Sequence, residues 1–325
     1  MPRGSIRVAA SAILTIALLA VLFSRTDLAA LKDCLLRTRW ASLGVALAML
    51  WSCSVVQAFR WRATLRAWEC PVPLPSLLRI VMIGIFFSMM LPTSAGGDVA
   101  RWSLLARRGG GRSLAAQSVA ADRLLGLFGL GLVVMIGLPS AWSSLPGGPW
   151  RTLILLVGPT TIMSLTAVMR PGWIPRRWRA RLGLTPARSL RWIGGAAALA
   201  VINHVLVILV VALLGRALAM EIDLAVHATL VPLVWLASML PISIGGLGVR
   251  ETSFVALYAA AGIPADQGAA IAMLWLLITL ANAMAGGLVF LVEMIRGDGG
   301  RSVASLGNDH QRATPSVIPA PAREG

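Results

Sequence analysis

Stretches of about twenty consecutive apolar residues recur along this 325-residue chain and constrain its fold more than any other feature. An α-helix of that length crosses the roughly 30 Å hydrocarbon core of a bilayer. The apolar residues are continuous rather than alternating, which favours helices over a transmembrane β-barrel. The sequence therefore predicts an all-α polytopic membrane protein. The full-length stretches are residues 6–24, 40–59, 118–140, 150–169, 192–214 and 268–295.

The charged residues lie mainly between these stretches. The net charge is +16, and of the 29 basic residues all but Lys32 are arginines. Arginines beside tryptophans at the ends of apolar stretches are typical of cytoplasmic loops that contact anionic headgroups. We therefore expect membrane lipids, and not nucleic acid, as partners. Three scattered histidines and three cysteines without C-x-x-C spacing predict no metal site and no cofactor.

Two regions are too short and too interrupted for a simple span. Residues 78–91 are apolar until the chain reaches a proline and the pair Gly96-Gly97, and residues 227–244 end in the same way at Gly245-Gly246. Apolar runs this short favour re-entrant hairpins. A hairpin also leaves the arginines on both sides of the first region in the cytoplasm, as the positive-inside rule prefers. These arginines are Arg60, Arg62, Arg66, Arg107, Arg108 and Arg112.

The predicted topology has about six full spans, two hairpins and both termini in the cytoplasm of a bacterial inner membrane. The loop 170–191, which contains seven arginines, is placed on the cytoplasmic side. We expect residues 6–24 to be an uncleaved first helix rather than a signal peptide. The basic segment 25–39 falls outside and fits this topology poorly, and its leucine spacing predicts an amphipathic surface helix. Residues 296–325 read as a disordered cytoplasmic tail.

A repeated motif relates the two halves of the predicted domain 1–295. The stretch LPTSAGGDVAR starts at Leu91 and LPISIGGLGVR starts at Leu240, and the two share Leu, Pro, Ser, Gly, Gly and Arg at identical offsets. Residues 6–140 and 150–295 each have the order span, span, hairpin, span. Three spans separate the hairpins, so the second hairpin enters from the opposite side. This order predicts an inverted-topology repeat, an architecture that transporters use.

The residues of the motif suit an anion. A Gly-Gly pair lets the chain unwind, and the helix that restarts presents free N–H groups and a positive dipole end. Arg101 and Arg250 follow, and a guanidinium can bind two phosphate oxygens at once. Purely structural roles for both arginines stay open. The candidate substrate-binding residues are Ser94, Gly96, Gly97, Asp98 and Arg101 in the first motif and Ser243, Gly245, Gly246, Arg250 and Glu251 in the second.

Several of these residues have a structural alternative. Ser94 and Ser243 are equally suited to capping the restarted helix. Asp98 has the i,i+3 spacing for an ion pair with Arg101. Asp122 and Arg123 form a candidate gate or ion pair, with a plain position at the membrane interface as the alternative.

Other polar residues are expected to be structural. We expect Asn203 and Asn282 to form interhelical hydrogen bonds and His204 and His227 to be packing or interface residues. The stretch RRGGGR at 107–112 lacks the G-K-[ST] ending of a phosphate-binding P-loop. The sequence also offers no Ser-His-Asp set and no catalytic carboxylate pair.

Three stretches together resemble a known family. FFSMMLPTSAGGDVARWSLL, then DRLLGL, then LPISIGGLGVRE are similar to the transmembrane region of the lysylphosphatidylglycerol synthases, over about residues 6–295. The matching positions are Gly96, Gly97, Asp98, Arg101, Asp122, Arg123, Pro241, Gly245, Gly246, Gly248, Arg250 and Glu251. The resemblance implies a flippase-like membrane domain. In the full-length synthases a separate soluble domain transfers the aminoacyl group. Only 30 residues follow position 295 here, so we expect no such domain and no enzyme activity.

The sequence leads to three functional hypotheses. The first is a flippase that moves an anionic phospholipid or a polyprenyl-phosphate-type lipid between leaflets, downhill or coupled to an ion gradient, with Asp98 and Glu251 as gating or proton-carrying groups. The second is a non-catalytic lipid-binding subunit that serves enzymes of a lipid- or glycan-modifying pathway. The third is a membrane enzyme that modifies a lipid headgroup.

Overall fold

The computed structural model describes residues 36–90, 96–141, 149–169, 187–239 and 246–296, together with positions 29, 32, 33, 177 and 185. All regular elements in these ranges are helices. The predicted span at 6–24, most of the predicted surface helix at 25–39 and the tail after Arg296 lie outside the described residues.

Among the described residues, four helices are long and apolar enough to cross a membrane: α3 (Trp40–Ala67), α6 (Arg112–Ala141), α9 (Leu190–Ala217) and α12 (Ala265–Ile295). At about 1.5 Å per residue, the 28 residues of α3 measure about 42 Å, which exceeds the hydrocarbon thickness. Each helix is longer than the apolar stretch that predicted it. The predicted stretch 150–169 forms α7 (Pro149–Met169). The described part of the chain is thus all-helical, and its long apolar helices support a multi-pass membrane protein.

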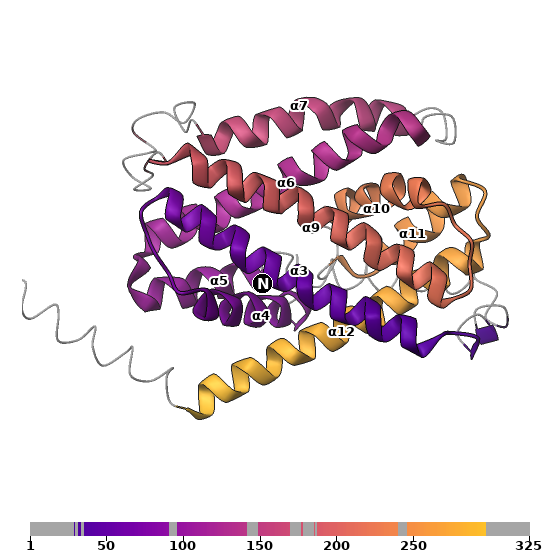
Figure 1. Cartoon of the computed structure of the whole chain (residues 1–325), viewed down its shortest axis with the longest axis horizontal. Helices are drawn as coiled ribbons and strands as arrows, with labels where there is room; N and C mark the ends of the chain where they lie inside the picture. The colour runs from indigo at the N-terminus through magenta and orange to yellow at the C-terminus, as the bar shows by residue number, and fades with distance from the viewer. Residues whose placement is uncertain are drawn as a thin grey trace, which may run out of the picture.

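The two interrupted regions form pairs of short helices, as the sequence predicts. The first pair is α4 (Leu74–Met90) and α5 (Gly96–Leu105), followed by the π-helical turn η1 (Ala106–Gly110). The second pair is α10 (Leu224–Ser238) and α11 (Val249–Ala260). Within each pair the two helices pack against each other. Figure 1 shows the pairs at opposite ends of the molecule, α4 and α5 at the left and α10 and α11 at the right.

The helices of the two halves match in order and length. α3 and α9 both have 28 residues, and α6 and α12 have 30 and 31. The turns after α3 and α9 also match. Glu69 and Ala219 have φ angles of 57° and 56°, and the next residue donates its N–H to a carbonyl oxygen five residues earlier in both turns.

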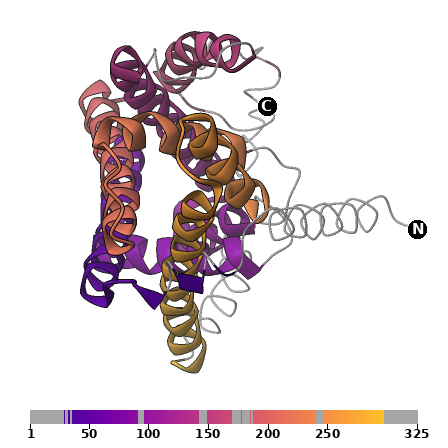
Figure 2. The same cartoon turned by 90° about the vertical axis from the view of Figure 1, so that its right-hand side faces the viewer.

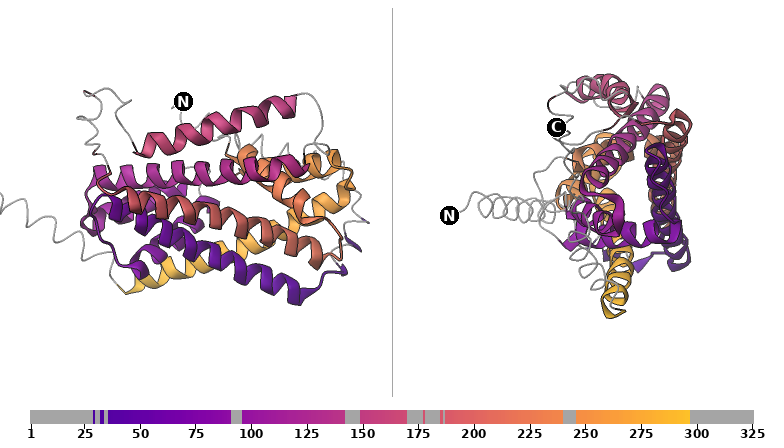
Figure 3. Two further views of the ribbon diagram at one scale, coloured as in Figure 1. Left: turned by 45° about the horizontal axis from the view of Figure 1, so that its top comes forward. Right: turned by 90° about the vertical axis from the view of Figure 1, so that its left-hand side faces the viewer.

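The long helices form an elongated bundle around an antiparallel pair. The Arg39 N–H donates to the Ala217 carbonyl at one end of α3 and α9, and the Arg188 N–H donates to the Ala67 carbonyl at the other, both at 2.8 Å. α4 packs on α12, and α10 packs on α6, so each short pair contacts the last long helix of the other half. Figure 3 shows the long helices running lengthwise. Figure 2 shows α7 at the periphery, beside α6.

The surface along the long helices is apolar. Trp40, Ile136 and Leu288 are 71%, 68% and 63% exposed. The interior is also apolar, with Trp61, Phe254 and Tyr258 among its fully buried side chains. A bundle that is apolar both inside and outside is what a bilayer requires.

Charged residues gather at the two ends of the bundle, and the two ends differ in their proportion of basic to acidic residues. The "basic end" is where α3 and α12 finish and α4, α6 and α9 begin. It carries Arg66, Arg79, Arg107, Arg108, Arg112, Arg188, Arg191 and Arg296 with Glu69 and Glu293. At the opposite end, which we call the "balanced end", the side chains that the structure describes include four basic and four acidic residues: Lys32, Arg37, Arg39, Arg216, Asp33, Glu221, Asp223 and Asp266. The α4–α5 pair opens toward the basic end, and the α10–α11 pair opens toward the balanced end.

Candidate functional site

The restart of the first interrupted helix lies in tight contact with its partner. Gly96 and Gly97 are the first residues of α5, and both are buried. A Cβ on Gly97 would lie 1.9 Å from the Ser88 hydroxyl oxygen and 2.4 Å from the Gly84 carbonyl oxygen, so only glycine fits. The Ser88 hydroxyl in turn donates to the Gly84 carbonyl at 3.0 Å. This close approach of α5 to α4 fixes where the next turn of α5 places Arg101.

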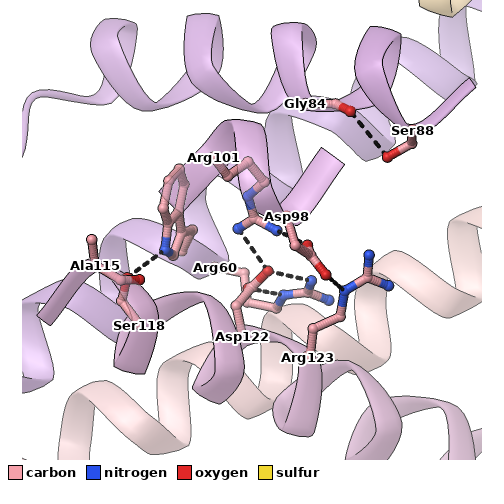
Figure 4. A network of polar contacts seen from close by, with 10 residues as sticks. Arg60, Gly84, Ser88, Asp98, Arg101, Ala115, Ser118, Asp122 and Arg123 are labelled. Carbon is pink, nitrogen blue, oxygen red and sulfur yellow. Dashed lines mark hydrogen bonds and ion pairs between the residues drawn. The ribbon is translucent and has the colours of Figure 1, made fainter. Parts of the chain in front are cut away.

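Arg101 enters a buried ion-pair network that joins three helices. Its Nη2 lies 2.8 Å from Oδ2 of Asp122 on α6, and Arg60 Nε on α3 lies 2.7 Å from Oδ1 of the same carboxylate. Figure 4 shows the two guanidiniums converging on Asp122. The three residues are 4%, 0% and 5% exposed for Arg101, Asp122 and Arg60. One carboxylate is therefore shared by two arginines inside the bundle.

An aromatic ring supports the Arg101 guanidinium from another side. The ring of Trp61 lies 4.2 Å from Arg101 Cζ, a cation–π contact. The Trp61 indole N–H donates to the Ser118 hydroxyl at 3.2 Å, which fixes the ring between α3 and α6. The Arg101 Nε is buried and has no hydrogen-bond partner.

A second, more exposed ion pair borders this network. Arg123 Nε lies 2.7 Å from Asp98 Oδ2, and Asp98 Oδ1 also lies 3.8 Å from Arg101. The Arg123 side chain is 48% exposed. Arg60, Arg101 and Arg123 against Asp98 and Asp122 leave one positive charge in excess. We call these five residues the "first corner".

Asp122 and Arg123, the candidate gate or ion pair, both form ion pairs in the structure but not with each other. Consecutive residues on a helix point about 100° apart, so their side chains cannot meet. Each residue instead pairs with a distant partner, Asp122 with Arg60 and Arg101, and Arg123 with Asp98. Asp122 is also fully buried, which excludes the alternative of an interface position. The i,i+3 contact of Asp98 with Arg101 is present.

Sequence reasoning missed Arg60. The sequence predicts a cytoplasmic loop at Arg60 because the apolar stretch stops at 59, whereas α3 continues to Ala67 and holds Arg60 inside the bundle. Arg60 lies seven residues before the end of α3, and Asp122 lies ten residues after the start of α6. At about 1.5 Å per residue, the network is about 10–15 Å from the basic end.

The restart of the second interrupted helix carries the other motif arginine. Gly246 and Gly248 have φ angles of 80° and 81°, a conformation that favours glycine. Arg250 follows in the first turn of α11, with Cζ 5.7 Å from the Trp235 ring centre. Its Nε is buried without a partner, and no carboxylate pairs with it among the residues that the structure describes. α11 ends ten residues later, so Arg250 is about 15 Å from the balanced end.

Glu251 caps the helix that carries Arg250. Its Oε2 accepts the Gly248 N–H at 2.6 Å, and the side chain is buried with Oε1 unpartnered. We call Trp235, Gly246, Gly248, Arg250 and Glu251 the "second corner". Of the other candidate residues, Ser94, Ser243 and Gly245 lie outside the described residues.

The remaining polar predictions concern packing. Asn282 on α12 donates to Ser54 on α3 at 3.5 Å, an interhelical hydrogen bond. His204 lies 3.0 Å from the Gly126 carbonyl, and His227 lies 2.7 Å from the Tyr258 hydroxyl. The described part of the chain contains no group of three or more His, Cys, Asp or Glu side chains able to hold a metal ion.

A comparison with protein families found a match over most of the chain. Residues 7–287 fit the model of the lysylphosphatidylglycerol synthase TM region. The chain belongs to this family. The matched range contains both corners, from Arg60 to Glu251. Membership in the lysylphosphatidylglycerol synthase TM region family confirms the resemblance seen in the sequence and supports a multi-pass membrane domain. A search of curated proteins found no match to the chain.

Proposed function

We propose that this protein is a lipid flippase that moves a lipid with an anionic headgroup between the leaflets of the bacterial inner membrane. The lipid is a phospholipid or a polyprenyl-phosphate-type lipid. Both motif arginines lie inside the apolar bundle, directly after the interruption of a helix. This observation carries the proposal.

The cost of these charges favours function. A charge at membrane depth costs about 2.5–3.5 kcal/mol or more, so intramembrane arginines mark sites of function by default. The first corner has one positive charge in excess, and the second has an arginine without a described carboxylate partner. The first corner therefore suits a negatively charged headgroup. In the second corner the Arg250 guanidinium suits the phosphate of a headgroup, although the adjacent Glu251 brings the summed charge of the two residues to zero.

The arrangement of the halves suits alternating access. The short helix pairs open toward opposite ends, and each packs on the last long helix of the other half. We interpret this as an inverted-topology repeat, in which the halves rock about a site between them. A headgroup would then pass from one corner to the other. The Asp98–Arg123 pair, the more exposed pair of the first corner, is the proposed gate on the side of the basic end.

The basic end is proposed to face the cytoplasm, which also places the end of α12 there. Cysteines introduced at Arg191 and at Asp223, in a cysteine-free background, test the orientation. A membrane-impermeant maleimide added to intact spheroplasts should label the Asp223→Cys variant alone. Labelling of the Arg191→Cys variant alone would reverse the orientation.

Translocation in proteoliposomes tests the proposed function. Vesicles contain phosphatidylglycerol with a fluorescent acyl chain, and dithionite quenches the outer leaflet. With the wild-type protein, dithionite should quench more than the half of the label that starts in the outer leaflet, because labelled lipid from the inner leaflet reaches the outer one. The Arg250→Ala variant should lose this additional quenching. Arg191→Ala, at an exposed position of the basic end, is the matched control and should behave as wild type.

Lipid binding without movement would favour the accessory-subunit hypothesis. The basic end, which offers a docking face for acidic lipids or partner enzymes, is the observation behind that alternative. The flippase proposal includes no covalent chemistry, so conversion of a lipid headgroup by the purified protein would contradict it.

A further inference from the structure

We infer that Glu293 holds the two halves of the protein together at the basic end. Its carboxylate joins α12, the last helix of the second half, to α4 and η1 of the first half. The halves separate at this end only when these ion pairs break. The inference rests on the proposed function, because it describes how one of the two access states of a flippase is stabilised.

Glu293 lies between two arginines of the other half. Its Oε1 lies 2.8 Å from Arg108 Nη2 on η1 and 3.5 Å from Arg79 Nη1 on α4. Arg108 also donates from Nη1 to the Ser76 carbonyl at 3.3 Å, which connects η1 to the start of α4. The Glu293 side chain is 14% exposed, whereas those of Arg79 and Arg108 are 44% and 30% exposed. One sheltered carboxylate thus links three elements of the two halves.

The same face of α12 packs tightly on α4. A Cβ on Gly286 would lie 2.1 Å from the Met82 carbonyl oxygen, so the two backbones approach closely. Phe290, one turn further along α12, stacks on Phe86 with ring centres 6.4 Å apart. Gly286, Phe290 and Glu293 are spaced by four and three residues and therefore share one face of the helix. We call these three residues and the facing part of α4 the "α4–α12 seam", with Arg79, Met82 and Phe86 on the side of α4.

The equivalent contact near the balanced end, where α10 packs on α6, is looser and uncharged. Residues 124–141 and 224–238 contain no Asp, Glu, Lys or Arg. A Cβ on Gly137 would lie 3.5 Å from the Ala228 carbonyl oxygen, which is an ordinary contact distance. A cavity of about 220 Å³ with an apolar lining lies beside this contact, between α6, α9 and α10.

This difference between the two contacts describes a protein that is closed at the basic end. Alternating access requires the contact at one end to open while the other closes. The ion pair of Asp98 with Arg123, the proposed gate, joins two helices of the first half and does not hold the halves together. The ion pairs of Glu293 cross between the halves. An interaction that is made in only one of two states shifts the equilibrium toward that state.

Distances between spin labels test the inference on the full-length protein in lipid nanodiscs. The labels are attached to cysteines introduced at Pro75, near the start of α4, and at Ile295, the last residue of α12, in a cysteine-free background. Both positions are exposed. Pulsed electron paramagnetic resonance then gives the ratio of the longer, open distance to the shorter, closed one.

Glu293→Gln keeps the size of the side chain and removes its charge. The ratio of open to closed protein should rise roughly fivefold, the upper value for a partly exposed ion pair. Glu69→Gln is the matched control, because it removes an ion pair with Arg188 at the same end but outside the α4–α12 seam, and it should leave the ratio unchanged. A distance distribution in Glu293→Gln identical to that of the wild type would overturn the inference.

Reversed charges test whether the pairing itself closes the seam. Glu293→Arg should open it further, because three arginines then meet at one place. Adding Arg108→Glu should restore the closed distance, because the ion pair forms again with the opposite polarity. A double variant that stays as open as Glu293→Arg would contradict the role of the pair.

The dithionite assay on the same proteins separates this inference from the proposed function. Opening of the seam in Glu293→Gln, without translocation by the wild type, would refute the flippase proposal alone. Translocation by the wild type, with the same label distances in wild type and Glu293→Gln, would refute this inference alone.

Discussion

Replacing Asp122 by asparagine should destabilise the protein strongly. The substitution keeps the size of the side chain and removes its charge. Arg60 and Arg101 would then face each other inside the bundle without the carboxylate that now lies 2.7 and 2.8 Å from them. Asp98, at 3.8 Å from Arg101, is too far away and too exposed to replace it.

The size of the effect follows from burial. At an effective dielectric constant of about 20, each contact of Asp122 is worth about 6 kcal/mol of gross attraction. Desolvation of the three charges offsets much of this gain. Removing one partner of a buried pair leaves the desolvation cost in place, and such changes cost about 3–5 kcal/mol. The corresponding substitution Glu69→Gln breaks a largely exposed ion pair with Arg188 and should cost less than about 1 kcal/mol of stability.

Thermal unfolding in detergent measures the difference. Asp122→Asn should lower the unfolding temperature by on the order of 10 °C, and Glu69→Gln should change it little. The combined variant Arg60→Met/Arg101→Met/Asp122→Leu should recover most of the loss, because no buried charge is left unpaired. The reasoning is refuted if Asp122→Asn unfolds within about 1 kcal/mol of wild type.

Two further predictions use the same unfolding assay. Gly97→Ala should lower stability by at least about 1–3 kcal/mol, because its Cβ would force α5 away from α4, whereas Gly44→Ala, with no atom within 4 Å of its Cβ, should not. An unchanged unfolding temperature in Gly97→Ala would contradict the close helix contact. Trp61→Phe should lower the free energy of unfolding by about 1–2 kcal/mol, because it loses the hydrogen bond to Ser118 and weakens the cation–π contact. If Trp61→Phe is no less stable than a variant with a neutral surface substitution, the ring does not support Arg101.

The interruptions of the short helices could be predicted from the sequence because their cause is local. Both interruptions combine a proline with a glycine pair, and this combination favours a break in a helix. Gly194-Gly195 and Pro232, each without the other feature, lie inside the continuous helices α9 and α10. The positions of α4, α5, α10 and α11 follow from that chemistry. The ends of the long helices could not be predicted as well. An apolar run ends at the first arginine, but a helix continues when that arginine, such as Arg60, has a partner inside the bundle.

The partners of the buried charges depend on tertiary structure. Arg60 and Asp122 are 62 residues apart, and nothing local connects them. A usable clue existed nonetheless: Asp122 lies inside an apolar stretch, and a buried carboxylate requires a cation from another helix. The cap formed by Glu251 was also readable, since a Glu three residues after a helix start can reach back to the first N–H.

The most direct test of the central claim is the identification of lipids retained by the purified protein, using native mass spectrometry. Wild type is compared with Arg250→Ala and with Arg101→Ala/Arg250→Ala, and the single variant leaves the buried network intact. If the repeated motif is a headgroup site, wild type retains one anionic lipid class, which both variants lose. Retention of the same mixed bulk phospholipids by all three proteins would contradict this account and would leave the arginines with structural roles.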